Sequence, residues 1–272
     1  DDVMEYILDP VVGSPSRNKK VYGNVCMHVD DLFFTGTARF VKSFVENIKK
    51  DFQIGSLDQD DIMFCGQRLI RQGGTVIVHQ DLCVDDLVEG LVPRGEKDTA
   101  PLDKVGHTEY RSILGKLNWL QSRTQFHVSY HFSRCASSAA SPTVGDMKEL
   151  NKVVRMVKTN PQRLIYRPLK GPLRIVAYPD ASYKNNSDGS SQRGHVIFLC
   201  EPRASEKASA LPVRGTLLDY ESHKIKRTVL STTVAELYAF MKCYGTAQFF
   251  RGLWMDLSGE EAPVHMRTDA NN

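Results

Sequence analysis

Two apolar, β-prone runs meet at a pair of adjacent carboxylates, Asp30 and Asp31, near the start of the chain. Residues 25–29 precede the pair and residues 32–34 follow it, with no Lys or Arg among them. Strand-like runs that meet at Asp-Asp predict a β-hairpin whose tip carries both acids. Asp is common in solvated turns, but two like charges at one tip repel unless solvent or a cation compensates them. We favour a tip that presents oxygen ligands to Mg²⁺ over a solvated turn.

The pattern after this hairpin predicts further elements of mixed type. Apolar residues three and four positions apart predict a helix over residues 38–52, which would pack behind the hairpin. Residues 62–70 and 75–78 are predicted strands joined at Gly73-Gly74, a dipeptide typical of hairpins. A short acidic amphipathic helix over residues 81–91 and a polar linker over residues 93–106 complete this part.

Three helices with one basic face are predicted next, over residues 109–120, over residues 126–136 and from Pro142-Thr143 onward. The first and third show apolar stripes at helical spacing. We expect these stripes to form the core of a small bundle: Tyr110, Ile113, Leu114, Leu117 and Leu120, with Met147, Leu150, Val153, Val154 and Val157. The third helix directs Lys148, Lys152, Arg155 and Lys158 outward.

The last third of the chain changes to a strand pattern, with predicted strands over residues 173–178, 194–200, 216–220, 225–230 and 264–267. A long helix capped by Thr232-Thr233 precedes the last strand. We predict that its inner face carries Val234, Leu237, Tyr238, Met241 and Tyr244.

Three acids lie at the ends or starts of these last elements. Asp180 ends the first strand, Glu236 lies early in the helix, and Asp269 follows the last strand. Each alone is best explained as a surface acid. Two-metal phosphodiester chemistry requires several carboxylates from different elements that converge on one point. Jointly, the three acids predict such a site.

Charge is distributed unevenly along the chain. Residues 1–103 carry 11 Lys/Arg and 18 Asp/Glu, residues 104–174 carry 13 and 3, and residues 175–272 carry 11 of each. A basic middle between segments with acidic clusters suggests a bound polyanion, although a solvated lysine-rich surface has the same composition.

Other features limit the class of protein. Six scattered cysteines without a C-x-x-C pattern favour a reducing, intracellular location and disfavour a disulfide framework or a zinc site. No apolar run is long enough for a membrane span, so no membrane partner is expected. The chain starts without Met, and we expect it to be a piece of a longer polypeptide.

Several short motifs occur together in one order along the chain. The first is His28-Val29-Asp30-Asp31-Leu32. The others are Phe64-Cys65-Gly66, Tyr110-Arg111-x-x-x-Gly115-x-Leu117-x-x-Leu120, Ser133-Arg134, Pro142-Thr143, Tyr178-x-Asp180-Ala181-Ser182, Ser191-Gln192-Arg193-Gly194 and Ser231-Thr232-Thr233-x-Ala235-Glu236. The first resembles the Tyr-x-Asp-Asp box of reverse transcriptases, and in this order the motifs resemble those of copia-type LTR retrotransposon Pol polyproteins over residues 21–272.

The resemblance implies an α/β (α+β) fold, truncated at both ends. It comprises a partial reverse-transcriptase palm with its hairpin (1–103), a helical thumb and connection (104–170), and a ribonuclease H-like mixed sheet with a helix (171–272). The implied activities are RNA-directed DNA polymerase and ribonuclease H. The implied partners are an RNA template, a DNA primer, an RNA–DNA hybrid and, in the complete parent, deoxynucleotides.

The resemblance also implies roles for individual residues. Mg²⁺ or Mn²⁺ would be bound by the catalytic residues Asp30, Asp31, Asp180, Glu236 and Asp269. Nucleic acid would be bound by Arg111, Lys116, Arg123, Arg134, Lys148, Lys152, Arg155 and Lys158. The family's first polymerase aspartate and its fourth ribonuclease H acid have no counterpart in this sequence, so the fragment alone is expected to lack full polymerase activity.

Two alternatives remain open. The first is a non-catalytic relic or host-retained fragment that only binds nucleic acid. The second is a stand-alone nuclease of the ribonuclease H-like superfamily. The hairpin followed by palm-like and thumb-like segments disfavours the nuclease alone, and the retention of all three later acids disfavours a pure relic. The sequence leaves the oligomeric state open.

Overall fold

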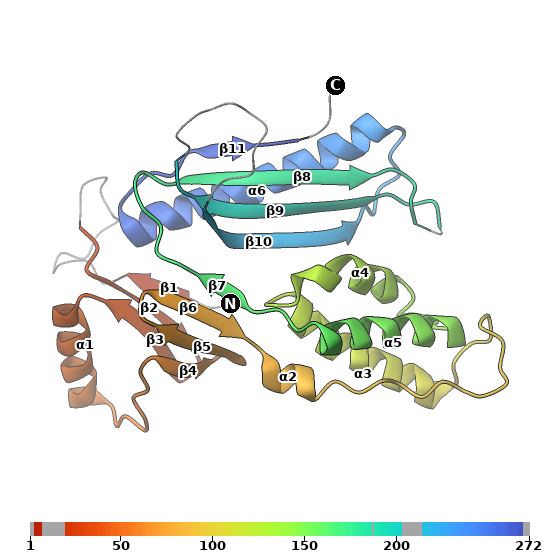
Figure 1. Cartoon of the computed structure of the whole chain (residues 1–272), viewed down its shortest axis with the longest axis horizontal. Helices are drawn as coiled ribbons and strands as arrows, with labels where there is room; N and C mark the ends of the chain where they lie inside the picture. Colours follow the sequence, from red (N-terminus) through yellow and green to blue (C-terminus); the bar gives the residue numbers. More distant parts are fainter. Residues whose placement is uncertain (1–2, 7–19, 187, 203–213, 269–272) are drawn as a thin grey trace.

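The computed structural model describes residues 3–6, 20–186, 188–202 and 214–268. It is a mixed α/β structure with three sheets and a helical block (Figure 1). In the view of Figure 1, the first two sheets lie at the lower left, the helical block at the lower right, and the last sheet with its long helix above them. The predicted fold class is confirmed. No helix in these ranges is long and apolar enough to cross a membrane.

The first sheet contains the predicted hairpin. Its order is β1-β2-β3, with β1 (Val3–Tyr6), β2 (Gly23–His28) and β3 (Asp31–Gly36) antiparallel to one another. Helix α1 (Ala38–Asp51) follows at once, because the side chain of Thr37 caps it by accepting a hydrogen bond from the Phe40 amide. The rings of Phe34 and Phe44 lie 5.0 Å apart and join the helix to the sheet.

The second sheet has the order β4-β5-β6-β7, with β4 (Asp61–Phe64), β5 (Gln67–Gln72), β6 (Thr75–His79) and β7 (Leu164–Tyr166). The prediction of one strand over residues 62–70 is wrong, because the chain turns at Cys65-Gly66, where φ is +46° and +65°. The hairpin at Gly73-Gly74 is confirmed. Strand β7, which the sequence did not reveal, pairs with β6 across more than eighty residues of chain.

The helical block contains α2 (Asp81–Asp85), α3 (Lys104–Gln121), a 3₁₀ turn η1 (Phe126–Val128), α4 (Ser129–Ser137) and α5 (Val144–Thr159). Both predicted apolar stripes lie in one core, as expected. Thr143 and Asp146 form a capping box that starts α5. The helix predicted over residues 81–91 is wrong beyond Asp85, since residues 87–92 continue without helical structure and Leu87 fills the core.

The last sheet has the order β10-β9-β8-β11, with β8 (Arg174–Ser182), β9 (Gln192–Cys200), β10 (Gly215–Lys224) and β11 (Val264–Met266). Strands β8, β9 and β10 are antiparallel, and α6 (Thr232–Ser258) then crosses over to β11, which is parallel to β8. The strand predicted over residues 225–230 is wrong. This segment is a loop whose Ile225 and Val229 are buried.

Helix α6 packs on the sheet with the face opposite to the predicted one. Its buried residues are small: Ala235, Ala239, Cys243 and Ala247. The residues predicted to face inward are exposed: Val234, Leu237, Tyr238, Met241 and Tyr244. Small side chains let the helix axis approach the sheet closely, which explains why the bulky residues point outward.

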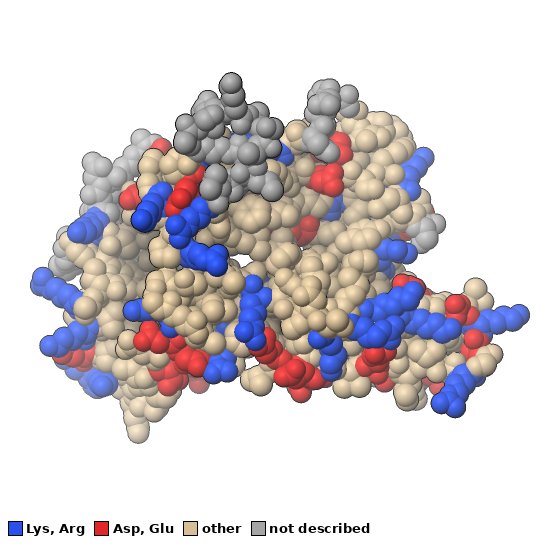
Figure 2. Space-filling view, in the orientation of Figure 1, with Lys and Arg blue, Asp and Glu red and all other residues tan. Residues whose placement is uncertain are grey.

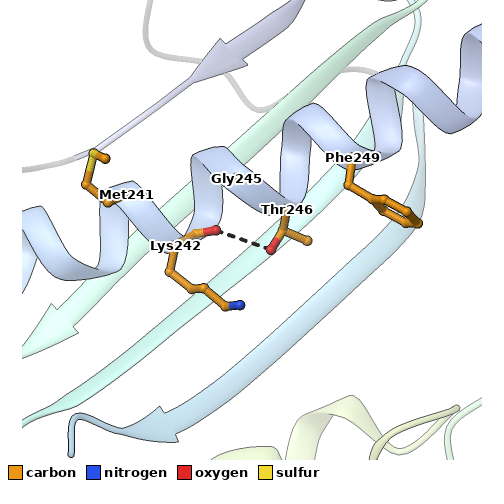
Figure 3. A pocket seen from close by; sticks show the side chains of 5 residues that line it. All are labelled: Met241, Lys242, Gly245, Thr246 and Phe249. Carbon is orange, nitrogen blue, oxygen red and sulfur yellow. Dashed lines mark hydrogen bonds between the residues drawn. The ribbon is translucent and has the colours of Figure 1, made fainter.

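The outward face of α6 contains a hollow of about 340 Å³, where Gly245 has no side chain between Met241 and Phe249. Figure 3 shows this stretch, in which the Thr246 hydroxyl donates a hydrogen bond to the Lys242 carbonyl. Among the described residues, none that lines the hollow carries a carboxylate. It therefore lies apart from the predicted catalytic acids.

Candidate functional site

The β2–β3 hairpin presents Asp30 and Asp31 at an exposed tip. His28 pairs with Asp31, so Val29 and Asp30 form a two-residue turn. Both carboxylates are exposed, and neither forms an ion pair with a Lys or Arg in the part of the chain that the structure describes. The predicted hairpin with accessible acids is confirmed. The tip thus presents hard oxygen ligands to solvent.

The backbone at this tip is strained. Val29 has φ +54°, a left-handed conformation that is costly for a β-branched residue. A positive φ at the first central residue is typical of the type II′ hairpin turn, where Gly is the usual residue. The side chain of Val29 is 83% exposed, so packing does not repay this cost. The hairpin register enforces the strained conformation.

Replacement of Val29 by Gly is expected to raise the free energy of unfolding by about 1 kcal/mol, because Gly adopts positive φ without steric conflict. Urea unfolding followed by circular dichroism measures the change. Val29→Ala is the matched control, since it removes the same exposed side chain but keeps the Cβ atom. Equal stabilities of the two variants would contradict a strained turn.

The C-terminal sheet brings together the segments that carry Asp180 and Glu236. Asp180 lies near the end of β8 and is exposed. Its neighbour Ala181 packs with Ala235, the residue before Glu236, in a small cluster completed by Ile225, Val229 and Tyr183. The two acidic positions therefore lie at the same end of the sheet.

Strand β11 approaches this end beside β8. Met266 pairs with Ala177, and the Arg267 amide donates a 2.9 Å hydrogen bond to the Ala177 carbonyl. Strand β11 is therefore the parallel neighbour of β8, reached through α6. Asp269 lies outside the described residues, so its place in the site stays a prediction.

The donor set has the chemistry of a magnesium site, since all five predicted ligands are carboxylates. Among residues 20–186, 188–202 and 214–268, no group of three or more His, Cys, Asp or Glu side chains is arranged to hold a metal ion. The predicted set in the last sheet has two members, Asp180 and Glu236, in these ranges. Metal binding at either site stays a prediction.

The basic face of α5 is largely paired within the protein. Lys148 binds Asp98 at 2.5 Å, Lys152 binds Glu149 at 2.5 Å, and Arg155 forms an ion pair with Glu89. Lys158 donates a 2.7 Å hydrogen bond to the Leu87 carbonyl. Figure 2 shows Lys/Arg and Asp/Glu side by side along the lower edge of the molecule. A nucleic acid would compete with these internal partners for the α5 cations.

A second stripe runs along the exposed side of α3 and into the turn that follows it, at intervals of four residues: Arg111, Gly115, Trp119 and Arg123. The Arg123 guanidinium lies 4.8 Å from the centre of the Trp119 ring. A Cβ atom added to Gly115 would meet open space. The α3 stripe therefore combines two cations, an open backbone position and an aromatic face.

The remaining predicted basic residues are Lys116 on α3 and Arg134 on α4. Lys116 donates a 3.1 Å hydrogen bond to the Asp86 carbonyl, and Arg134 is exposed on α4. Trp119, which is 37% exposed, was missed by the sequence analysis. Its signal is the spacing of four residues to Arg123, which brings a guanidinium over an aromatic ring at the end of a helix.

The helical block is fixed to the last sheet by two polar contacts. The Tyr220 hydroxyl donates a 2.6 Å hydrogen bond to the Gln121 carbonyl at the end of α3, and burial raises the pKa of this hydroxyl. Gln192 on β9 donates a 3.1 Å hydrogen bond to the Ser133 hydroxyl on α4. The α3 stripe thus has a fixed position relative to the sheet that carries Asp180.

Comparison with known proteins identifies relatives of one kind. The retrovirus-related Pol polyprotein from transposon RE1 of Arabidopsis thaliana is 26% identical over 151 residues, which cover 55% of this chain. The transposon Ty1-ER2 Gag-Pol polyprotein of Saccharomyces cerevisiae is 21% identical over 291 residues, which cover 94% of this chain. This chain is similar to the Pol polyproteins of retrotransposons. The resemblance inferred from its motifs is confirmed.

The homologous Pol polyproteins are much longer than this chain, which spans 9% of the RE1 polyprotein and 16% of the Ty1-ER2 polyprotein. No protein-family model matches the chain. Among solved structures, a foamy viral protease-reverse transcriptase in complex with an RNA/DNA hybrid aligns with a TM-score of 0.42 and 15% sequence identity. The alignment covers 90% of this chain and 30% of that one.

Proposed function

We propose that this Pol homologue is the part of a retrotransposon polyprotein that joins a reverse-transcriptase palm and thumb to a ribonuclease H-like unit, and that it binds an RNA–DNA hybrid. The observation that carries the proposal is the C-terminal sheet. There an α6 crossover joins β8 to the parallel strand β11, and Asp180 and Glu236 lie at one end of the sheet.

The order of features along the chain supports this proposal. The Asp30-Asp31 hairpin precedes the helical block, and the block precedes the sheet. The similarity to the Ty1-ER2 polyprotein covers 94% of the chain, so it includes all three parts. A stand-alone nuclease has no need of the first two parts. A polymerase that copies RNA and a nuclease that degrades the copied strand share one hybrid substrate.

Mg²⁺ or Mn²⁺ is the proposed cofactor, held by Asp30 and Asp31 at the hairpin and by Asp180, Glu236 and Asp269 at the sheet. In such sites the cation polarises a phosphoryl oxygen and activates the attacking oxygen. The residues of this chain contribute negatively charged oxygens on separate rigid elements, a hairpin tip, a strand end and a helix start. Rigid elements hold ligands more accurately than loops do.

We expect the α3 stripe to bind the hybrid more strongly, residue for residue, than the α5 cations. Arg111→Gln with Arg123→Gln should lower the salt dependence of binding by roughly 0.7–0.9 per lost phosphate contact. The matched set on α5 is Lys148→Gln, Lys152→Gln, Arg155→Gln and Lys158→Gln, whose cations already have internal partners. Fluorescence anisotropy of a labelled hybrid in EDTA, titrated with salt, measures both sets.

The same assay tests the proposed function. Binding of a hybrid at low salt, followed by cleavage of its RNA strand when Mg²⁺ or Mn²⁺ is added, is the expected result. A parent chain that shows no affinity for the hybrid would refute the proposal. If the α3 and α5 sets lowered the affinity for the hybrid equally per substituted residue, only the role of the α3 stripe would be refuted.

A second candidate function is nucleic-acid binding without catalysis, as in a relic or a host-retained fragment. It is favoured by one observation, namely that residues 104–174 carry 13 Lys/Arg against 3 Asp/Glu, a charge that suffices for binding without any metal site. Binding that persists in EDTA, without cleavage in either metal, would support this alternative over the enzyme.

A further inference from the structure

The loop between β10 and α6 is anchored at both of its ends. The Ile225 amide donates a 2.8 Å hydrogen bond to the Ser191 carbonyl, and the Tyr183 hydroxyl donates one of 3.2 Å to the Leu230 carbonyl. Ile225 and Val229 are buried, with 4% and 5% of their surface exposed. These contacts give residues 225–230 a defined position without strand pairing.

Between the two buried anchors, the loop presents Lys226 and Arg227 to solvent. Neither side chain forms a hydrogen bond or an ion pair with any residue in the described ranges. Nearby cations on the sheet differ in this respect, since Lys224 is paired with Asp188 and Arg193 with Glu221. The hydrogen bond from Lys224 holds the pKa of Asp188 below its ordinary value. The two cations of the loop are therefore unpaired within the part of the chain that the structure describes.

The anchors place this charge beside the candidate acids. Ile225 and Val229 share their cluster with Ala181 and Ala235, which are the immediate neighbours of Asp180 and Glu236. The loop, the end of β8 and the start of α6 thus meet around one small apolar cluster. Carboxylates beside unpaired cations suit a phosphodiester backbone, because the acids bind metal ions and the cations bind adjacent phosphates.

We propose that Lys226 and Arg227 bind backbone phosphates of the nucleic acid that lies at the Asp180–Glu236 end of the sheet. This inference rests on the proposed function and adds a binding surface to its second site. The surface is formed by main-chain anchoring rather than by a helix. Its contacts are with phosphates, so they are independent of base sequence.

The test is the double substitution Lys226→Gln and Arg227→Gln in the full chain. Its binding of a labelled RNA–DNA hybrid is measured in EDTA over a range of salt concentrations. Loss of two phosphate contacts should reduce the salt slope by roughly 0.7–0.9 per contact and weaken binding on the order of tenfold or more at 0.1 M salt. Both side chains are exposed, so the thermal unfolding midpoint should not change.

The matched control is Lys49→Gln with Lys50→Gln, an adjacent exposed pair at the end of α1 on a different part of the molecule (Figure 1). It removes the same charge and should leave the slope nearly unchanged. Equal effects of the two double variants would overturn the inference and leave the proposed function intact. A parent chain that does not bind the hybrid would overturn the proposed function itself. If the double variant unfolds, each single substitution is measured instead. Unchanged binding of the hybrid by both single variants would also overturn the inference.

Discussion

Substitution of Asp180 by Asn is expected to remove the stabilisation that Mg²⁺ gives through the sheet site and to abolish any cleavage of a hybrid. A ligand that binds only the folded state raises its stability by RT ln(1 + [L]/Kd), about 2.7 kcal/mol at a concentration of 100 Kd. Asp180 is exposed at the end of β8, so the exchange removes charge without disturbing a buried contact. Thermal unfolding with increasing Mg²⁺ or Mn²⁺ measures the first effect, and release of a labelled RNA fragment the second.

Asp256→Asn is the matched control for this experiment. Asp256 lies in the last turn of α6, at the opposite end of the helix from Glu236. The control should show the full metal-induced shift of the parent. Equal shifts in all three proteins, with cleavage retained, would mean that Asp180 is no metal ligand. Parallel substitution of Asp30 and Asp31 separates the hairpin from the sheet site.

Replacement of Ala239 by Leu should destabilise the C-terminal unit by about 3 kcal/mol, at the upper end of what overpacking costs. Ala239 is 1% exposed on the face of α6 that meets the sheet. A Leu side chain there forces the helix away from β8. The two residues have similar helix propensity, so the loss reports packing. Urea unfolding of a Trp119→Phe background is the measurement, because Trp254 then remains as the fluorophore and packs against the core of this unit.

Leu237→Ala provides the opposite test on the same helix. Leu237 is 58% exposed, so its truncation should change the free energy of unfolding by less than about 0.5 kcal/mol. The apolar pattern of the sequence predicts the reverse, with Leu237 on the inner face of the helix. A large loss from Leu237→Ala and none from Ala239→Leu would contradict the orientation of α6 described above.

The sequence by itself determined the local elements and their order. The hairpin at Asp30-Asp31 follows from two β-prone runs that flank a turn, and the register of β2 and β3 agrees with it. The core of the helical block follows from apolar residues at helical spacing, all of which are buried. In both cases the signal lies within a few turns of chain, where side-chain periodicity reports the buried face directly.

Contacts between distant segments were decided only by the tertiary structure. Strand β7 joins β6 because the folded helical block returns the chain to an open edge of the second sheet. The sequence does not reveal β7, because a strand of three residues is too short to show a periodic pattern. The α5 cations meet Glu89 and Asp98 because the segment after α2 runs alongside that helix. The amino-acid composition shows that residues 104–174 are basic, but it does not show which acids pair with these cations.

The largest reversal concerns the helix that carries Glu236. Apolar periodicity identifies an amphipathic face, but it cannot decide whether the core prefers large or small side chains. The fully buried positions of α6 carry only Ala and Cys, because the helix lies close to the sheet there, and the five bulky residues predicted to face inward are exposed. The loop with Lys226 and Arg227 was predicted as a strand for a related reason. Its two apolar residues are buried as anchors, and burial alone does not distinguish a strand from an anchored loop.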